Sequence, residues 1–298
     1  MTFHVMKSSH CNLCGQSLDG LVFTYASSRH PTQRPLVICA ECNAHAARCR
    51  LCQRPMAERL AQEGICAFCL LELERCASCG RPVDDGIELK DGTHRVFCHT
   101  CVQTLPACLA CQAPVDARGS RLPDGRVRCR FCDVTAVDDP AQAQALYEQV
   151  LKIAAQRLGL ELSIPTVLVP VDADQLRAVL QQIEGVHQTE ARPPRGVYAR
   201  KGMKRGIYVE MGLPRVQMIE VIAHELGHAW QAERKPLLND PLLVEGFAEW
   251  VAYKVLAVLG ASTAMDLMRA RTDVYGQGLR RVLAWQTDDP MTILERSR

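Results

Sequence analysis

The stretch Ala223-His-Glu-Leu-Gly-His-Ala-Trp230 lies inside a longer segment of this 298-residue chain, Pro214 to Glu233, in which apolar residues recur at helical spacing. Because proline suits the first turn of a helix, we expect a helix that begins at the first residue of this segment. Side chains four residues apart lie on one helix face, so His224 and His228 would present both imidazoles to one metal ion. Glu225 lies between them, placed to accept a proton from water on that metal.

A second helical segment supplies a third metal ligand. It begins near Pro241, with Asp240 as the expected N-cap. Its Glu245 would complete a His₂Glu set with the two histidines and leave a fourth position open for water, as in thermolysin-type zinc enzymes. The metzincin ligand set requires glycine at 231 and histidine at 234, where this chain has Gln231 and Arg234. The sequence therefore predicts one catalytic zinc ion on His₂Glu ligands.

The rest of the C-terminal part alternates helical and strand-like patterns. The expected elements are helices at 139–158 and 176–183 and strands at 164–171, 196–201 and 206–211. These elements belong to the second predicted domain, residues 136–298. The stretch 192–205 carries six basic residues among proline and glycine. It is typical of a solvated loop, and the alternative is a site for an acidic substrate segment.

All 16 cysteines precede residue 133, and they form eight Cys-x-x-Cys pairs. One tight turn can direct two such thiolates at one ion, and two turns complete a tetrahedral zinc site. The gaps between pairs alternate between long ones of 13 to 24 residues and short ones of 6 residues, which groups the pairs two by two. We expect four structural zinc ions, bound by Cys11, Cys14, Cys39 and Cys42; by Cys49, Cys52, Cys66 and Cys69; by Cys76, Cys79, Cys98 and Cys101; and by Cys108, Cys111, Cys129 and Cys132.

Each unit of this array reads as a metal-binding turn, a β-hairpin, a second turn and a short helix, so the array is an internal repeat. Its predicted modules are 11–42, 49–69, 76–101 and 108–132, within an N-terminal domain over residues 1–135. Short modules bury little apolar surface, so zinc would hold their fold. Eight repeated pairs favour zinc over redox chemistry, and iron–sulfur clusters use other spacings.

Composition limits the partners. The net charge is +2 and aromatic residues make up 5% of the chain. Nucleic-acid binding needs a strong basic excess or aromatic platforms, so nucleic acid is disfavoured as a partner. The N-terminal residues do not form an apolar signal segment, and no apolar run approaches the ~18 residues of a membrane span. We therefore expect a cytoplasmic protein without membrane contact, in a compartment where paired cysteines more often bind metal than form disulfides.

Three segments together carry a resemblance to a known family: Ala223–Trp230, Glu245-Gly246 and Val274-Tyr-Gly-Gln-Gly-Leu-Arg280. They resemble the LIM-domain-bearing, ubiquitin-activated peptidases that restrict organ growth in plants, over roughly residues 140–290. The zinc modules resemble LIM domains, but their connectors are 6 residues long and every ligand is cysteine. The resemblance implies a compact gluzincin-type zinc peptidase domain, mixed α/β with the metal-binding helix in its middle, behind LIM-like or zinc-ribbon β-hairpin modules.

The resemblance also implies roles for residues around the metal. Glu249 would accept a hydrogen bond from a ligand histidine. Tyr275 is the candidate donor to the oxyanion that forms on the cleaved carbonyl, with Tyr208 and His187 as alternatives.

Two functions from different classes follow. The first is a zinc metalloprotease: an endopeptidase in which a zinc-activated water attacks a peptide bond, Glu225 is the general base, and the modules recruit a protein substrate or partner. The second is a scaffold whose zinc modules bind a protein partner and whose peptidase-like domain is inactive. The intact set of His224, Glu225, His228 and Glu245 favours the enzyme.

Overall fold

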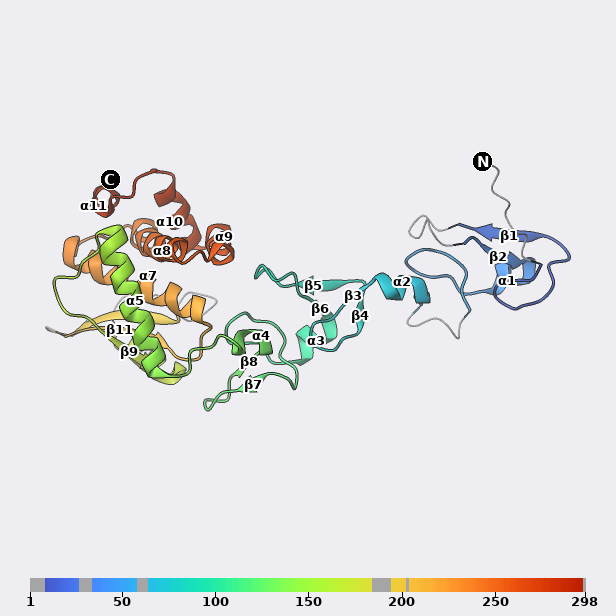
Figure 1. The fold of residues 1–298 in the computed structure, drawn as a ribbon, viewed down its shortest axis with the longest axis horizontal. Helices are drawn as coiled ribbons and strands as arrows, with labels where there is room; N and C mark the ends of the chain where they lie inside the picture. The colour runs from blue at the N-terminus through green and yellow to red at the C-terminus, as the bar shows by residue number, and fades with distance from the viewer. Residues whose placement is uncertain (1–8, 27–33, 58–63, 184–193, 202–203, 297–298) are drawn as a thin grey trace. The chain divides into compact units, whose positions relative to one another are not determined.

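The structure is a computed structural model that describes residues 9–26, 34–57, 64–183, 194–201 and 204–296. Short strands and helices make up the N-terminal part, and long helices around a small sheet make up the C-terminal part (Figure 1). The chain divides into two compact units, Met1–Gly86 and Ile87–Arg298. A domain boundary near residue 135 stays a prediction.

One turn geometry recurs at the first cysteine pair of every module. The residue before the first cysteine forms a β-bridge seven positions further on, as in His10–Ser17, Arg48–Pro55, Arg75–Pro82 and Ala107–Pro114. The residue after the second cysteine has a positive φ, which is 75° at Gly15, 59° at Gln53, 74° at Gly80 and 63° at Gln112. Glycine adopts this conformation without steric cost, whereas glutamine does not. The recurrence agrees with the internal repeat predicted from the sequence.

The second cysteine pair of every module begins a short helix. Its first cysteine occupies the N-cap of α1 (Ala40–His45), α2 (Ala67–Glu72), α3 (His99–Thr104) or α4 (Arg130–Asp133). Strand pairs precede three of these helices: β1 (Val22–Tyr25) with β2 (Leu36–Cys39), β5 (Gly86–Glu88) with β6 (Val96–Cys98), and β7 (Ser120–Arg121) with β8 (Val127–Arg128). A further pair, β3 (Glu74–Arg75) with β4 (Pro82–Val83), surrounds the third module's first turn. In the second module the expected hairpin falls partly on 58–63, outside the described residues.

The C-terminal part is a mixed α/β region. Its elements in chain order are α5 (Pro140–Leu158), β9 (Val167–Val171), α6 (Ala173–Gln182), β10 (Gly196–Lys201), β11 (Lys204–Glu210), α7 (Arg215–Arg234), α8 (Pro241–Val258), α9 (Ser262–Ala270), α10 (Val274–Leu283) and α11 (Pro290–Glu295). The sheet order is β10-β11-β9, antiparallel between β10 and β11 and parallel between β11 and β9. This makes β10 an edge strand.

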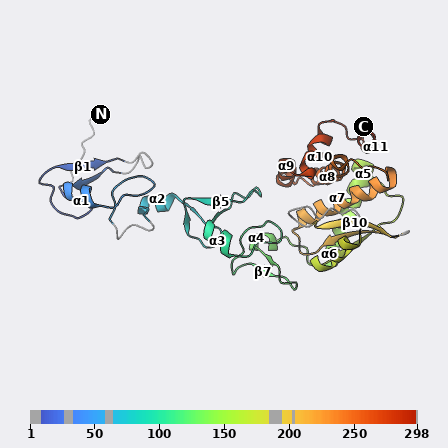
Figure 2. The same ribbon diagram turned by 180° about the vertical axis from the view of Figure 1, so that it is seen from behind.

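Helices cover both faces of this sheet. A Cβ built at Gly196 in β10 would meet side chains of Val221 and Glu225, so α7 lies on the face to which Gly196 points. Val197 and Tyr208 pack with α6 and so point to the other face. Figure 2 shows α6 and α7 on opposite sides of the sheet. Side chains alternate along a strand, so Gly196, Tyr198 and Arg200 share the α7 face.

The fourth zinc module packs against the C-terminal elements within the second unit. Its Leu109 belongs to the same apolar core as α5, α7 and α8. Arg128, only 5% exposed, donates a hydrogen bond of 2.9 Å to the carbonyl of Gly212. Arg126 forms an ion pair with the buried carboxylate of Glu210. The spacing of the cysteines gives no indication of this docking.

No helix in the described part of the chain is both long and apolar enough to span a membrane.

Candidate metal centres and catalytic site

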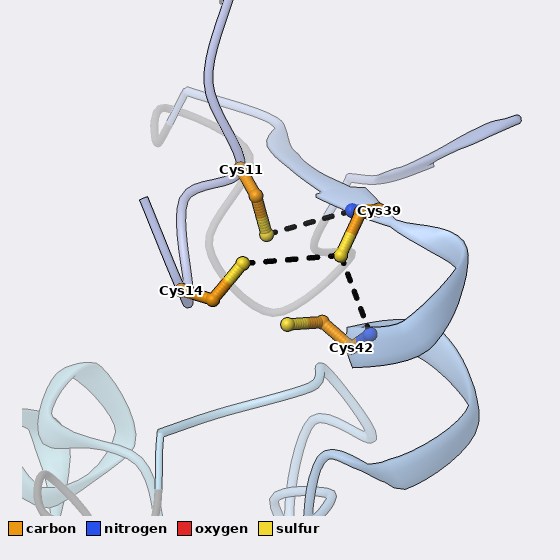
Figure 3. Close-up of side chains that lie close together, drawn as sticks. All are labelled: Cys11, Cys14, Cys39 and Cys42. Carbon is orange, nitrogen blue, oxygen red and sulfur yellow. Dashed lines mark hydrogen bonds between the residues drawn. The ribbon is translucent and has the colours of Figure 1, made fainter. Parts of the chain in front are cut away.

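All 16 cysteines fall into the four groups predicted from their spacing. Figure 3 shows the first group, in which the turn at Cys11 and Cys14 and the start of α1 direct four sulfur atoms at one point. Zinc–sulfur bonds of about 2.3 Å in a tetrahedron place sulfur atoms about 3.8 Å apart. The Cys14–Cys39, Cys52–Cys66 and Cys111–Cys129 sulfur distances are 3.9, 3.8 and 3.7 Å. These three groups therefore have the dimensions of Cys₄ zinc sites, and in the remaining group the four sulfur atoms lie within 4.8 Å of one another.

Backbone N–H groups stabilise the thiolate that zinc requires. In the second module the N–H of Cys66 lies 3.4 Å from Sγ of Cys49. Burial raises the pKa of Cys49, but backbone donors at Cys66, Cys52 and Leu51 outweigh it and lower that pKa to about 6. These donors therefore favour the thiolate form of Cys49, which is the form that binds metal.

Arg95 supplies donors to the fourth Cys₄ group that the sequence did not reveal. Its guanidinium nitrogens lie 3.8 Å from Sγ of Cys129 and 3.7 Å from Sγ of Cys111. It is held by an ion pair of 2.5 Å with Asp91 and lies over the ring of Phe131. A positive charge beside these sulfurs favours their thiolate form.

The second kind of centre lies between α7 and α8. Nε2 of His224 and Nε2 of His228 are 3.0 Å apart, and Oε2 of Glu245 lies 3.3 Å and 3.5 Å from them. Ligand atoms about 2 Å from a tetrahedral zinc ion are about 3.3 Å apart. The Asp240 side chain caps the start of α8 as expected, with a hydrogen bond of 3.1 Å from the N–H of Leu242, and so fixes where Glu245 falls on that helix. The structure thus brings together the three predicted ligands.

Hydrogen bonds behind each imidazole determine which nitrogen carries the proton. Nδ1 of His224 lies 3.2 Å from Oε1 of Glu249, and Nδ1 of His228 lies 3.0 Å from Oε1 of Gln231. The Gln231 amide nitrogen donates to the carbonyl of Val244, so its oxygen accepts. Both Nδ1 atoms are therefore donors, and both Nε2 lone pairs face the centre. Two Nε2 atoms 3.0 Å apart repel each other unless a positive charge lies between them, and either a proton or a metal ion can supply that charge.

Glu245 also favours a positive charge at this centre. Its Oε2 atom is buried and accepts no hydrogen bond from a donor in the described part of the chain. Burial raises the pKa of Glu245, but contact with His224 and His228 lowers it well below its usual range. Burial lowers the pKa of His224, and its two carboxylate neighbours reverse this and raise it well above its usual value. The three side chains thus fit a divalent cation.

Glu225 lies on the same helix, next to the ligands. It is only 7% exposed, and its Oε2 accepts a hydrogen bond of 2.7 Å from the backbone N–H of Tyr198 in β10. That bond fixes the carboxylate between the metal-binding face of α7 and the edge strand. Gly196 leaves room for this arrangement, because a Cβ at that position would lie 2.5 Å from Cγ1 of Val221 and 3.2 Å from Cγ of Glu225.

A third group of residues lies behind His224. Glu249 contacts its Nδ1 as the resemblance implied, and Arg271 lies 3.3 Å from the same Glu249 oxygen. The Arg271 guanidinium also lies 4.5 Å from the ring centroid of Tyr275. The rings of Tyr275 and His224 have centroids 5.7 Å apart, so the structure places Tyr275 beside the centre.

The other two predicted oxyanion donors are not placed there. Tyr208 packs with α6 on the sheet face opposite α7. It was an incorrect alternative, because strand alternation directs its side chain away from the metal-binding helix. His187 lies outside the described residues. The hydrogen bond between Gln231 and His228 was not predicted from the sequence. The position of Gln231, three residues after His228 on one helix, could have indicated it.

Comparisons of the chain with models of known protein families, with curated proteins and with solved structures find no match.

Proposed function

We propose that the C-terminal domain is a zinc-dependent endopeptidase of the gluzincin type. The observation that carries the proposal is the convergence of three acceptor atoms, from His224, His228 and Glu245, on one point beside an oriented carboxylate, Glu225. The chemistry of this donor set suits zinc, with a fourth coordination position for water or substrate.

The reaction would proceed as follows. A bound zinc ion would polarise the substrate carbonyl and make water acidic enough to lose a proton near neutral pH. Glu225 accepts that proton, and the oxygen of the water forms a bond to the carbonyl carbon. The same carboxyl then gives the proton to the amide nitrogen as the carbon–nitrogen bond breaks. The N–H of Tyr198 holds the carboxylate in place for both transfers.

The residues behind His224 have positioning roles in this proposal. The carboxylate of Glu249 keeps Nδ1 of His224 protonated and its Nε2 lone pair toward the centre. Tyr275 is the proposed donor to the oxyanion, because its ring is next to that of His224. The Cys₄ modules would be structural and would present surfaces to a protein substrate or partner.

Proteome-wide cleavage-site profiling of the full-length protein tests the proposal, with Glu225→Gln beside the wild type. Glutamine keeps the side-chain volume and all three ligands, so zinc should remain while cleavage falls by about 10²–10⁴-fold. Glu148→Gln, an exposed change on α5, serves as a matched control that should cleave normally. If Glu225→Gln holds zinc and cleaves like the wild type, the scaffold function replaces the enzyme.

A further inference from the structure

A pocket of about 270 Å³ opens on the α7 face of the sheet, where β10 ends. Tyr198 and Arg200 of β10 and Arg205 of β11 line it, and the loop at Ser163 and the end of α7 at Glu233 close its other sides. Tyr198 and Arg200 are two residues apart on one strand, so both side chains point to this face.

Two arginines dominate the charge of this pocket. Arg200 and Arg205 are direct partners across the β10–β11 ladder. Like charges directly opposite each other destabilise a sheet. An anion bound to both guanidinium groups would offset the repulsion between them. Burial raises the pKa of Tyr198, and the positive charges of Arg205 and Arg200 oppose that shift, which places both charges within reach of the phenol.

The one carboxylate that lines the pocket among the described residues does not neutralise it. The oxygens of Glu233 accept backbone hydrogen bonds of 2.8 Å from Ser163 and 3.0 Å from Ile164. That carboxylate therefore fastens the 163–164 loop to α7. Among the described residues that line the pocket, two guanidinium groups thus accompany one carboxylate.

The pocket adjoins the proposed catalytic base through one residue. The backbone N–H of Tyr198 binds Glu225, while the Tyr198 side chain lines the pocket. Arg200 follows two residues later, about 7 Å along the strand. Because β10 is an edge strand, an extended peptide paired with it would pass both the base and the pocket.

We propose that this pocket is a specificity subsite that binds an aspartate or glutamate side chain of the substrate, about two residues from the scissile bond. Arginine suits this role because its planar guanidinium can bind a carboxylate through two parallel hydrogen bonds. The subsite rests on the proposed peptidase function and names its substrate class, which is an acidic peptide segment.

The test compares peptide libraries cleaved by the full-length wild type and by Arg200→Glu/Arg205→Glu. The wild type should favour peptides with Asp or Glu near the cleaved bond by roughly tenfold or more in kcat/KM, as expected for a charge-assisted contact. The double variant should favour Lys or Arg at that position instead. Lys204→Glu makes the charge change of one of these two substitutions on the same hairpin, but its side chain points to the opposite sheet face. This control should keep the acidic preference.

The outcomes separate the subsite from the chemistry. A wild type that cleaves peptides without acidic preference, or a double variant that retains that preference, overturns the subsite and leaves the peptidase proposal intact. If no peptide is cleaved, the peptidase proposal fails, and a binding measurement then tests the subsite separately. Fluorescence anisotropy would then compare a labelled peptide containing Asp with its Asn counterpart on full-length Glu225→Gln. Tighter binding of the Asp peptide supports the subsite, and equal binding overturns it.

Discussion

Gly246 in α8 and Gly278 in α10 are in such close contact that neither position has room for a Cβ. A Cβ on Gly246 would lie 2.5 Å from the carbonyl carbon of Gly278, and one on Gly278 would lie 2.7 Å from Cα of Gly246. These neighbours are backbone atoms, which cannot move as a flexible side chain can. Because Glu245 and Tyr275 lie on the same two helices, this crossing sets the distance between a metal ligand and the proposed oxyanion donor.

We expect Gly278→Ala to push α8 and α10 apart. Overpacking of this kind typically lowers the free energy of unfolding by about 1–3 kcal/mol, and the melting temperature should fall by several degrees. Cleavage should fall further than stability alone explains, because Glu245 and Tyr275 would separate. Gly20→Ala is the control, since a Cβ there meets no atom within 4 Å. Equal melting temperatures for Gly278→Ala and the wild type would contradict the crossing.

Metal content gives a second prediction. Four Cys₄ groups and one His₂Glu group imply five zinc ions per chain. Elemental analysis of protein purified without chelator should return close to five, and His224→Ala should reduce that number by one while the cysteine sites stay filled. If the wild type contains about four zinc ions per chain and His224→Ala contains the same number, the predicted catalytic zinc site is wrong.

The metal ligands were predictable from the sequence because their geometry is local. Four-residue spacing on a helix is enough to pair His224 with His228, and the N-cap at Asp240 sets the position of Glu245 on the next helix. The Cys₄ groups follow likewise from short turns and alternating gaps. For the two histidines and within each Cys-x-x-Cys turn, the distance along the chain determines the distance in space.

The surroundings of the site were not predictable, because they depend on packing between distant segments. Tyr198 meets Glu225 only when β10 lies beside α7, 27 residues away in sequence. Arg271 reaches Glu249 because α9 and the following turn fold back on α8. Arg128 and Gly212 are 84 residues apart, so the docking of the fourth module was invisible in the cysteine spacing.

That docking predicts a difference between two otherwise similar cysteine variants. Cys132→Ser removes a ligand of the fourth Cys₄ group, whose module supplies Arg128 and Leu109 to the C-terminal core. Metal binding folds such modules, so this change should lower the temperature at which the C-terminal helices melt. Cys14→Ser removes a ligand from the first group, in the other compact unit, and should leave that temperature unchanged. Far-UV circular dichroism measures both, and identical melting of the two variants would contradict a structural role for the docked module.

The last prediction concerns Arg271, which touches no metal ligand atom yet holds two residues behind the site. Its guanidinium lies 3.3 Å from Oε1 of Glu249 and 4.5 Å from the ring centroid of Tyr275. In Arg271→Met, the buried Glu249 would lose its ion pair with Arg271 and keep its contact with Nδ1 of His224, and the Tyr275 ring would lose its contact with the guanidinium. Changes behind metal ligands typically cost about 10–100-fold in metal affinity or activity. We expect that loss mainly in kcat, because Tyr275 would act on the oxyanion rather than on the bound substrate.

Arg271→Lys should recover part of the lost activity, since the positive charge remains. Arg269→Met, which breaks an exposed ion pair with Asp266, should match the wild type. A rise in KM at constant kcat would instead assign Arg271 to substrate binding and remove its positioning role.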